Sequence, residues 1–159
     1  MPQVPCLVRD GRIVEDEWTL VIEGDAAPGI IAPFAAWRKK PAGAGVWVEG
    51  DAEAEEIGPL VAAAPVVAVR FPAIVDGRGL SLGALLRTRY GFVGELRAFG
   101  DIIPDITEYM HRCGFNAFVL PDLEQAEVAI ACIGRMSDHY QASVRQPKPP
   151  FQEPTTRRP

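Results

Sequence analysis

The alternation of strand-like and helix-like segments between residues 46 and 133 limits the fold more than any other feature of the sequence. Short β-branched or apolar runs, such as Val66–Phe71 (VVAVRF), alternate with longer segments whose apolar residues recur at helical spacing, such as Ala52–Ala64. A nearly continuous apolar strand is typical of a parallel sheet covered on both faces. The expected strands are 46–49, 66–71, 95–99 and 117–120, and the expected helices are 52–64, 81–90, 104–113 and 123–133.

These segments predict an α/β fold of four successive strand–helix units that form a parallel sheet with right-handed crossovers. The pattern fits an open doubly wound sheet and a half-barrel equally well. Four units are half the complement of an eightfold barrel, so the pairing of two chains in a homodimer is a further alternative.

The residues on either side of this α/β body do not continue the alternation of strand-like and helix-like segments. At the start, CLV and RIV flank Asp10–Gly11, which predicts a tight β-hairpin, and a third strand is expected over 18–22. A short amphipathic segment follows at 30–40. The proline-rich end has the composition of a disordered tail. We therefore divide the chain into an N-terminal hairpin and helical lead-in (1–45), an α/β body (46–141) and a tail (142–159).

Composition excludes several classes of function. A net charge of −5 argues against general nucleic-acid binding, which needs a basic surface. The sequence has no apolar run of about 18 residues and no export signal at its start, so we expect a cytoplasmic protein with no membrane contact. Its three cysteines are far apart and its two histidines lie in no metal-ligand spacing. No metal and no cofactor is expected.

Charged and glycine residues follow three neighbouring strands of the predicted sheet. Asp76-Gly77-Arg78-Gly79 comes after the strand that ends at Phe71, and Gly100–Asp101 and Pro121–Asp122 follow the next two strands. The carboxyl ends of parallel strands meet at one edge, where α/β folds bind ligands. The sequence therefore predicts a ligand site at this edge.

The Gly-Arg-Gly loop leads into a helix for which Ser81 is the expected N-cap. Free amides at a helix start, together with the Arg78 guanidinium, suit a phosphate, sulfate or carboxylate. The alternative is a tight strand-to-helix turn with a solvated arginine. Asp76 and Asp101 are candidate catalytic acids or bases, although Asp101 is better explained as the cap of the helix that begins near Pro104.

Arg97 lies inside a short strand, where a charge must be paired or reach a cleft, and Glu95, Asp76 or Asp101 is its expected partner. Cys113 shares an apolar helical stripe with Ile106 and Met110, so it is interpreted as a core residue rather than a nucleophile. The predicted ligand-binding residues are Asp76, Gly77, Arg78, Gly79, Ser81, Arg97, Asp101 and Arg112.

Three long motifs resemble a bacterial family of unknown function that is encoded beside sulfite reductase genes. They are DGRGLS, LLRTRYGFVGELRAFGD and MHRCGFNAF, and Tyr140–Gln141 closes the pattern. The chain departs from the family where Ile74–Val75 replace an aromatic residue before the Asp-Gly pair, and where Asp105–Ile106 replace an acid–glutamine pair.

This resemblance implies a role in assimilatory sulfur metabolism, where members are sometimes labelled oxidoreductases. Sulfite reduction moves six electrons through cofactors, and no motif here binds flavin, haem or an iron–sulfur cluster. We therefore expect an accessory protein that binds a small oxyanion or a partner protein, such as sulfite reductase or its electron donor. The alternatives are an enzyme on a barrel-like scaffold with Asp76 or Asp101 as acid/base, and a pure interaction module.

Overall fold

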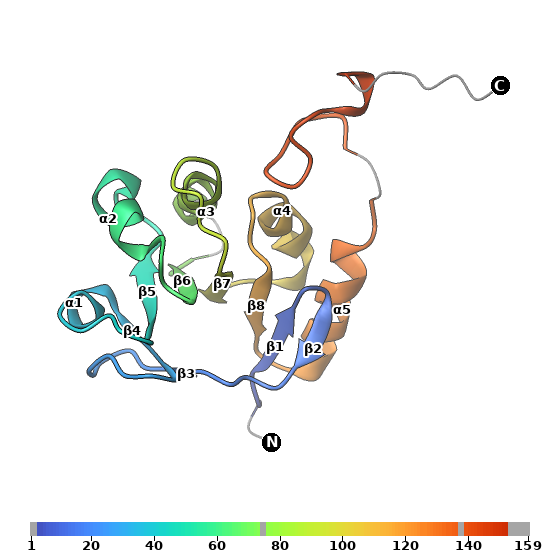
Figure 1. Ribbon diagram of the computed structural model, residues 1–159. Helices are drawn as coiled ribbons and strands as arrows, with labels where there is room; N and C mark the ends of the chain where they lie inside the picture. Colours follow the sequence, from blue (N-terminus) through green and yellow to red (C-terminus); the bar gives the residue numbers. More distant parts are fainter. Residues whose placement is uncertain (1–2, 74–75, 137–138, 153–159) are drawn as a thin grey trace.

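The computed structural model describes residues 3–73, 76–136 and 139–152. An eight-stranded sheet with the order β2-β1-β8-β7-β6-β5-β4-β3 curls into a half-barrel, and the helices lie on its convex side (Figure 1). The strands are β1 (Cys6–Arg9), β2 (Arg12–Val14), β3 (Thr19–Leu20), β4 (Ile30–Pro33), β5 (Gly45–Glu49), β6 (Val66–Phe71), β7 (Glu95–Gly100) and β8 (Ala117–Leu120). The α-helices are α1 (Phe34–Trp37), α2 (Ala54–Val61), α3 (Arg78–Thr88), α4 (Thr107–Arg112) and α5 (Leu123–Ile133); short 3₁₀ turns cover Pro104–Ile106 and Pro150–Gln152.

The sheet is mixed, with mostly parallel strands. Strands β3 to β8 pair in parallel, whereas β1 pairs antiparallel with both β2 and β8. The N-terminal hairpin is confirmed: its turn is Asp10–Gly11, and both residues have positive φ. The hairpin adds to the sheet beside β8, at the opposite edge from β3.

The description of the body as four strand–helix units forming a parallel sheet is not confirmed. The segment expected to be a short amphipathic stretch divides into strand β4 and the one-turn helix α1. Ile30 and Ile31 are β-branched and suit a strand, and Pro33 ends it because proline has no N–H for the sheet but is tolerated at a helix start. The parallel series therefore begins before residue 46.

A short connection explains why the sheet curls. Strands β2 and β3 form opposite edges of the sheet, yet only residues 15–18 join them. A flat sheet would separate these edges by about 34 Å, from strand spacings of about 4.8 Å, while the connection reaches about 17 Å when extended. The edges must therefore approach each other, and the connection, which we call the strap (residues 15–18), crosses the open side of the half-barrel (Figure 1).

Strand β6 is covered on both faces, as its apolar sequence predicts. Val67, Val69 and Phe71 face the helices, while Val66 and Ala68 face the concave side. The concave cluster is small and aromatic, and is made of Trp18, Leu20, Ile31, Trp47, Val66, Ala68, Phe99 and Val119. Trp47 also donates its indole N–H to the Val21 carbonyl at 2.9 Å, which ties the chain after β3 to the inside of the sheet.

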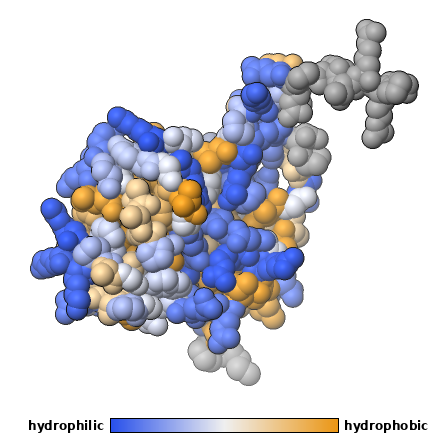
Figure 2. All heavy atoms as spheres, viewed as in Figure 1, coloured by the Kyte–Doolittle hydropathy of each residue, from blue (hydrophilic) through white to orange (hydrophobic). Residues whose placement is uncertain are grey.

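The face of the molecule shown in Figure 2 is mostly hydrophilic, and the apolar residues on this face form patches separated by polar ones. None of the helices in the part of the chain that the structure describes has the length and apolar character to cross a membrane.

Candidate functional site: the carboxyl rim of the half-barrel

The loops that follow β5, β6, β7 and β8 lie at the same end of the sheet because these strands are parallel neighbours. We call this end the carboxyl rim. The rim is the edge at which the sequence predicts a ligand site. Of the predicted residues, the structure places Asp76, Gly77, Arg78, Gly79, Ser81 and Asp101 here, and it places Arg97 and Arg112 elsewhere.

Helix α3 begins at Arg78, three residues before the predicted start at Ser81, and this boundary corrects the sequence prediction. The reason is Asp76, whose Oδ1 accepts the backbone N–H of Arg78 at 3.2 Å and so holds the first turn. Gly77 is the N-cap residue, and Ser81 is an exposed residue of the second turn. Ser81 therefore does not cap the helix.

The Asp76 carboxylate also pairs with the Arg78 side chain. Arg78 Nε and Nη2 donate to its two oxygens at 2.9 and 2.7 Å, and Nη1 reaches Asp51 at 3.4 Å. The Arg78 hydrogen bonds lower the pKa of Asp76 to about 2. Two carboxylates thus already neutralise the guanidinium that the sequence assigns to an external anion.

Gly79 is buried, and its role is close packing. A Cβ at this position would lie 2.8 Å from the Phe71 ring. The second glycine of the Gly-Arg-Gly loop therefore lets α3 approach β6, rather than offering a free amide to a ligand.

A shallow depression of about 230 Å³ separates the starts of α2 and α3. Its lining is rich in acidic side chains, namely Asp51, Glu53 and Glu55, beside Arg78 and Ser81. The outer side of the rim is therefore acidic around one neutralised arginine.

Arg70 and Glu49 are rim residues that the sequence reasoning missed. Glu49, Arg70 and Phe99 are neighbours in register at the ends of β5, β6 and β7, and they share the concave face with Trp47. Arg70 pairs with Glu49 at 3.1 Å and lies over the Trp47 ring, and both charged side chains are more than one-third exposed. The alternation of Val66, Ala68 and Arg70 along the strand is the signal that could have identified this side chain.

Asp101 is one of the residues that line a pocket of about 460 Å³ between the ends of β7 and β8. The pocket is lined largely by apolar residues, including Phe99, Ile102 and Val119, with Gln125 as a further polar group. Gly100 has a φ of 104°, and the following Asp101 N–H donates to the Phe71 carbonyl at 2.8 Å. The backbone turn after β7 thus fixes the position of this aspartate on the rim.

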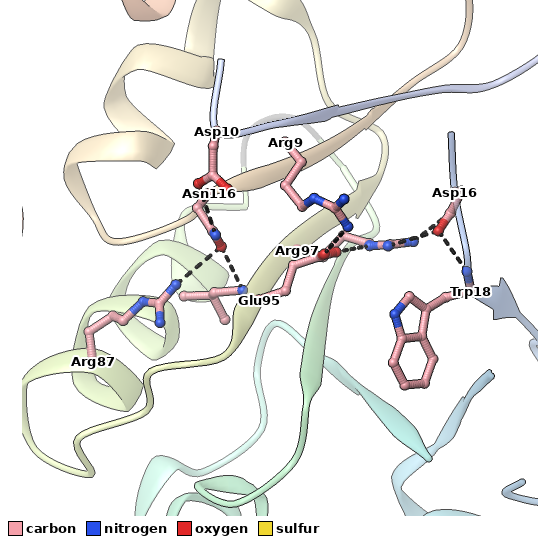
Figure 3. Close-up of polar contacts among 9 residues, drawn as sticks. Arg9, Asp10, Asp16, Trp18, Arg87, Glu95, Arg97 and Asn116 are labelled. Carbon is pink, nitrogen blue, oxygen red and sulfur yellow. Dashed lines mark hydrogen bonds and ion pairs between the residues drawn. The ribbon is translucent and has the colours of Figure 1, made fainter. Parts of the chain in front are cut away.

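Arg97 belongs to a buried network rather than to the rim (Figure 3). Its side chain is 1% exposed and is paired with Glu95 at 2.7 Å and, through two bonds of 2.7 and 3.0 Å, with Asp16 of the strap. Arg9 of β1 also bonds to Glu95, at 3.3 Å. The predicted partner Glu95 is confirmed, whereas Asp16 was not foreseen. Two arginines and two carboxylates therefore join β1, β7 and the strap on the concave side.

Arg112 ends helix α4, at the opposite end of the sheet from the rim. Its Nη2 donates to the Gln141 carbonyl at 3.2 Å, and its buried Nε–H has no hydrogen-bond partner among the residues that the structure describes. Cys113 is partly buried against the core beside it, and burial raises the pKa of its thiol. This environment fits the core interpretation of Cys113. Among the described residues there is no cluster of three or more potential metal ligands.

The fold and its rim define an α/β half-barrel protein with a charged carboxyl edge. Residues 45–151 match the family described as "Bacterial protein of unknown function (DUF934)", and the chain belongs to this family. The match spans β5 to the C-terminal segment and includes every predicted ligand residue. No curated protein and no solved structure matches the chain.

Proposed function

We propose that the protein is an accessory protein of assimilatory sulfite reduction that binds a partner protein through the carboxyl rim. The resemblance of the DGRGLS, LLRTRYGFVGELRAFGD and MHRCGFNAF motifs supports the metabolic assignment. The charge of the rim supports the mode of binding. Sulfite reductase and its electron donor are the proposed partners.

The observation that carries the proposal is the acidity of the rim. Carboxylates outnumber guanidinium groups at the ends of β5, β6 and β7, with Glu49, Asp51, Glu53, Asp76 and Asp101 against Arg70 and Arg78. All of these side chains are partly or fully exposed. A surface of this kind attracts a basic surface on another protein and accelerates their encounter.

Binding of a small oxyanion at Asp76–Gly79 is the other form of the proposal. The anion would have to displace Asp76 from Arg78, because that carboxylate already accepts two side-chain bonds and the first amide of α3. The nearby Asp51 and Glu53 would also repel it. The rim charges therefore favour a basic protein surface over a free anion.

The test is a binding titration of the purified protein against sulfite reductase and, separately, against its electron donor. Glu53→Lys reverses an exposed rim charge whose side chain forms no hydrogen bond or ion pair with a described residue. Glu127→Lys reverses a similarly exposed charge on α5, away from the rim. We expect the Kd for one of these partners to rise about fivefold or more for Glu53→Lys, to stay unchanged for Glu127→Lys, and to rise with salt. No binding to either partner, or equal effects of the two substitutions, would contradict the proposal.

An enzyme that uses Asp101 as its acid/base is the second candidate, and the pocket of about 460 Å³ beside Asp101 is the observation that favours it. Asp76 is the weaker acid/base candidate because a pKa of about 2 keeps it ionised and makes it a poor proton acceptor. Asp101→Asn keeps the shape of the side chain and removes its proton chemistry. In a bacterium that lacks the protein, the enzyme hypothesis predicts that this variant fails to restore growth on sulfate. The docking hypothesis predicts at least partial growth, because the variant loses only one of the five rim carboxylates.

A further inference from the structure

Arg87, Arg112 and Arg145 differ from the arginines of the rim and of the buried network. Within the described part of the chain, none of the three forms an ion pair with a carboxylate. Their side chains bond instead to carbonyl oxygens and to Asn116. They lie around the C-terminal ends of α3 and α4, at the end of the sheet opposite the rim. In a protein with a net charge of −5, positive charge without a counter-charge calls for an explanation.

Arg87 is held rigidly where the chain enters β7 and β8. Its Nε donates to the Gly114 carbonyl at 2.9 Å, and Nη1 donates to the carbonyls of Phe92 and Gly94 at 2.8 and 2.9 Å. Its Nη2 donates to Asn116 Oδ1 at 3.2 Å (Figure 3). Asn116 in turn donates to Asp10 at 3.2 Å. The guanidinium is thus fixed by neutral acceptors, and no described residue pairs with it directly to cancel its charge.

Arg145 brings a second positive charge to the same place from the C-terminal segment. Burial lowers the pKa of Arg87, the charge of Arg145 lowers it further, and Asp10 opposes this with a smaller effect. Burial and then Arg145 also lower the pKa of His111, against the smaller effects of Glu108 and Asp10. Arg145 is therefore close enough to Arg87 and His111 for its charge to lower the pKa of both groups, in addition to the larger effect of burial.

The two guanidinium groups retain unused donors. A guanidinium has five N–H bonds. One on Arg87 and three on Arg145 have no partner among the described residues. The two bonds that Arg145 does make, to the carbonyls of His111 and Phe115, are long at 3.4 Å. Arg145 can therefore turn toward a better acceptor at little cost.

A pocket of about 320 Å³ lies between these groups and is lined by Arg87, Phe92, Val93, Gly114, Asn116, Val144 and Arg145. Among the residues that the structure describes, no carboxylate lines this pocket. From this arrangement we infer that Arg87 and Arg145 form a site for a small inorganic oxyanion such as sulfate or phosphate. The anion accepts the unused N–H bonds of both guanidinium groups and removes their mutual repulsion. Because Arg145 belongs to the C-terminal segment, the bound anion also fastens that segment to the ends of α3 and α4.

This site is separate from the carboxyl rim, and its failure would leave the proposed partner binding intact. The rim arginine Arg78 is neutralised by Asp76 and Asp51, whereas the Arg87–Arg145 pair has no direct counter-charge in the described part of the chain. We therefore expect sulfate to bind at the Arg87–Arg145 pair and not at Arg78.

Thermal unfolding in sodium sulfate tests the inference, with sodium chloride added to keep the ionic strength constant. Sulfate stabilises most proteins by exclusion from the surface, and this effect grows steadily with concentration. We expect in addition a saturable rise in Tm of about 3 °C at millimolar sulfate. Arg145→Gln loses the saturable part. Two control variants retain it: Arg12→Gln, at an exposed arginine of β2 with no side-chain hydrogen bond or ion pair to a described residue, and Arg78→Gln at the rim.

An equal saturable rise in Arg145→Gln and the unaltered protein, or no saturable rise at all, would overturn the inference. A measurement on the unaltered protein gives a second test that needs no variant to fold. Sulfate should shift the NMR signals of the Asn116 side-chain amide and of the Gly94 and Gly114 backbone amides. Shifts confined to residues 76–81 would place the anion at the rim and refute the assignment to Arg87 and Arg145.

Discussion

The substitution Asp16→Ala tests the anchoring of the strap across the half-barrel. Asp16 supplies two of the charged bonds to Arg97, at 2.7 and 3.0 Å, and the Arg97 side chain is 1% exposed. Removal of the Asp16 carboxylate leaves Arg97 paired with Glu95 alone. The Nη1 and Nη2 groups of Arg97 then remain inside the sheet without this acceptor. Removing one partner of a buried ion pair typically costs about 3–5 kcal/mol. Since the Asp16 side chain is 35% exposed and water can enter in its place, we expect a loss of about 3 kcal/mol, at the lower end of this range.

Urea unfolding followed by tryptophan fluorescence measures this loss, and thermal unfolding should show a fall in Tm of about 6–12 °C. Arg97→Met together with Asp16→Ala completes a double-mutant cycle, for which we expect a coupling of about 2 kcal/mol or more. The matched control is Arg89→Ala, which removes an exposed pair with Glu55 and should cost less than about 1 kcal/mol. If Asp16→Ala costs no more than Arg89→Ala, the strap is not held through Arg97 and the reasoning is wrong.

Three further predictions concern single residues, namely Asp76, Gly83 and Cys113. The Asp76 carboxyl should titrate at about pH 2 by NMR and return toward its ordinary value in Arg78→Ala; because its folded pKa is lowered, its stabilising effect is present above the pKa of the unfolded chain and is lost as pH falls toward about 2. Gly83→Ala places a Cβ 2.4 Å from an aromatic ring and should lower the free energy of unfolding by about 1–3 kcal/mol, whereas Gly134→Ala, with no atom closer than 3.9 Å, should change it by less than about 0.5 kcal/mol. Burial raises the pKa of Cys113, so iodoacetamide at pH 8 should alkylate it more slowly than free cysteine, as peptide mass mapping would show; an equal rate would contradict its place in the core.

The parts of the fold that depend on local pattern could be predicted from the sequence. The apolar run of β6, the Asp-Gly turn of the hairpin and the helix from Leu123 appear where their residues indicate. The start of α3 was misplaced because both Asp76 and Ser81 are residue types that can hold a helix start, and the Asp76 side chain binds the Arg78 amide before Ser81 is reached. Periodicity alone cannot rank such competing caps.

The parts that depend on strand order could not be predicted in the same way. The ion pair between Asp16 and Arg97 joins residues 81 positions apart in the sequence. Neither segment has a local pattern that identifies the other as its partner. The curl of the sheet follows from the short strap, but only once β2 and β3 are known to be opposite edges. Arg145 was assigned to a disordered tail on composition, although in the structure its guanidinium reaches the end of α4.

The most direct test of the proposed function is a map of the surface that a bound partner protects. Amide hydrogen exchange of the protein, alone and with sulfite reductase or its electron donor, gives such a map at peptide resolution. The account predicts slower exchange at the carboxyl rim, over residues 49–55, 76–82 and 101–103, with little change in α5 or the N-terminal hairpin. Protection concentrated on α5 and the hairpin, with the rim unaffected, would contradict it.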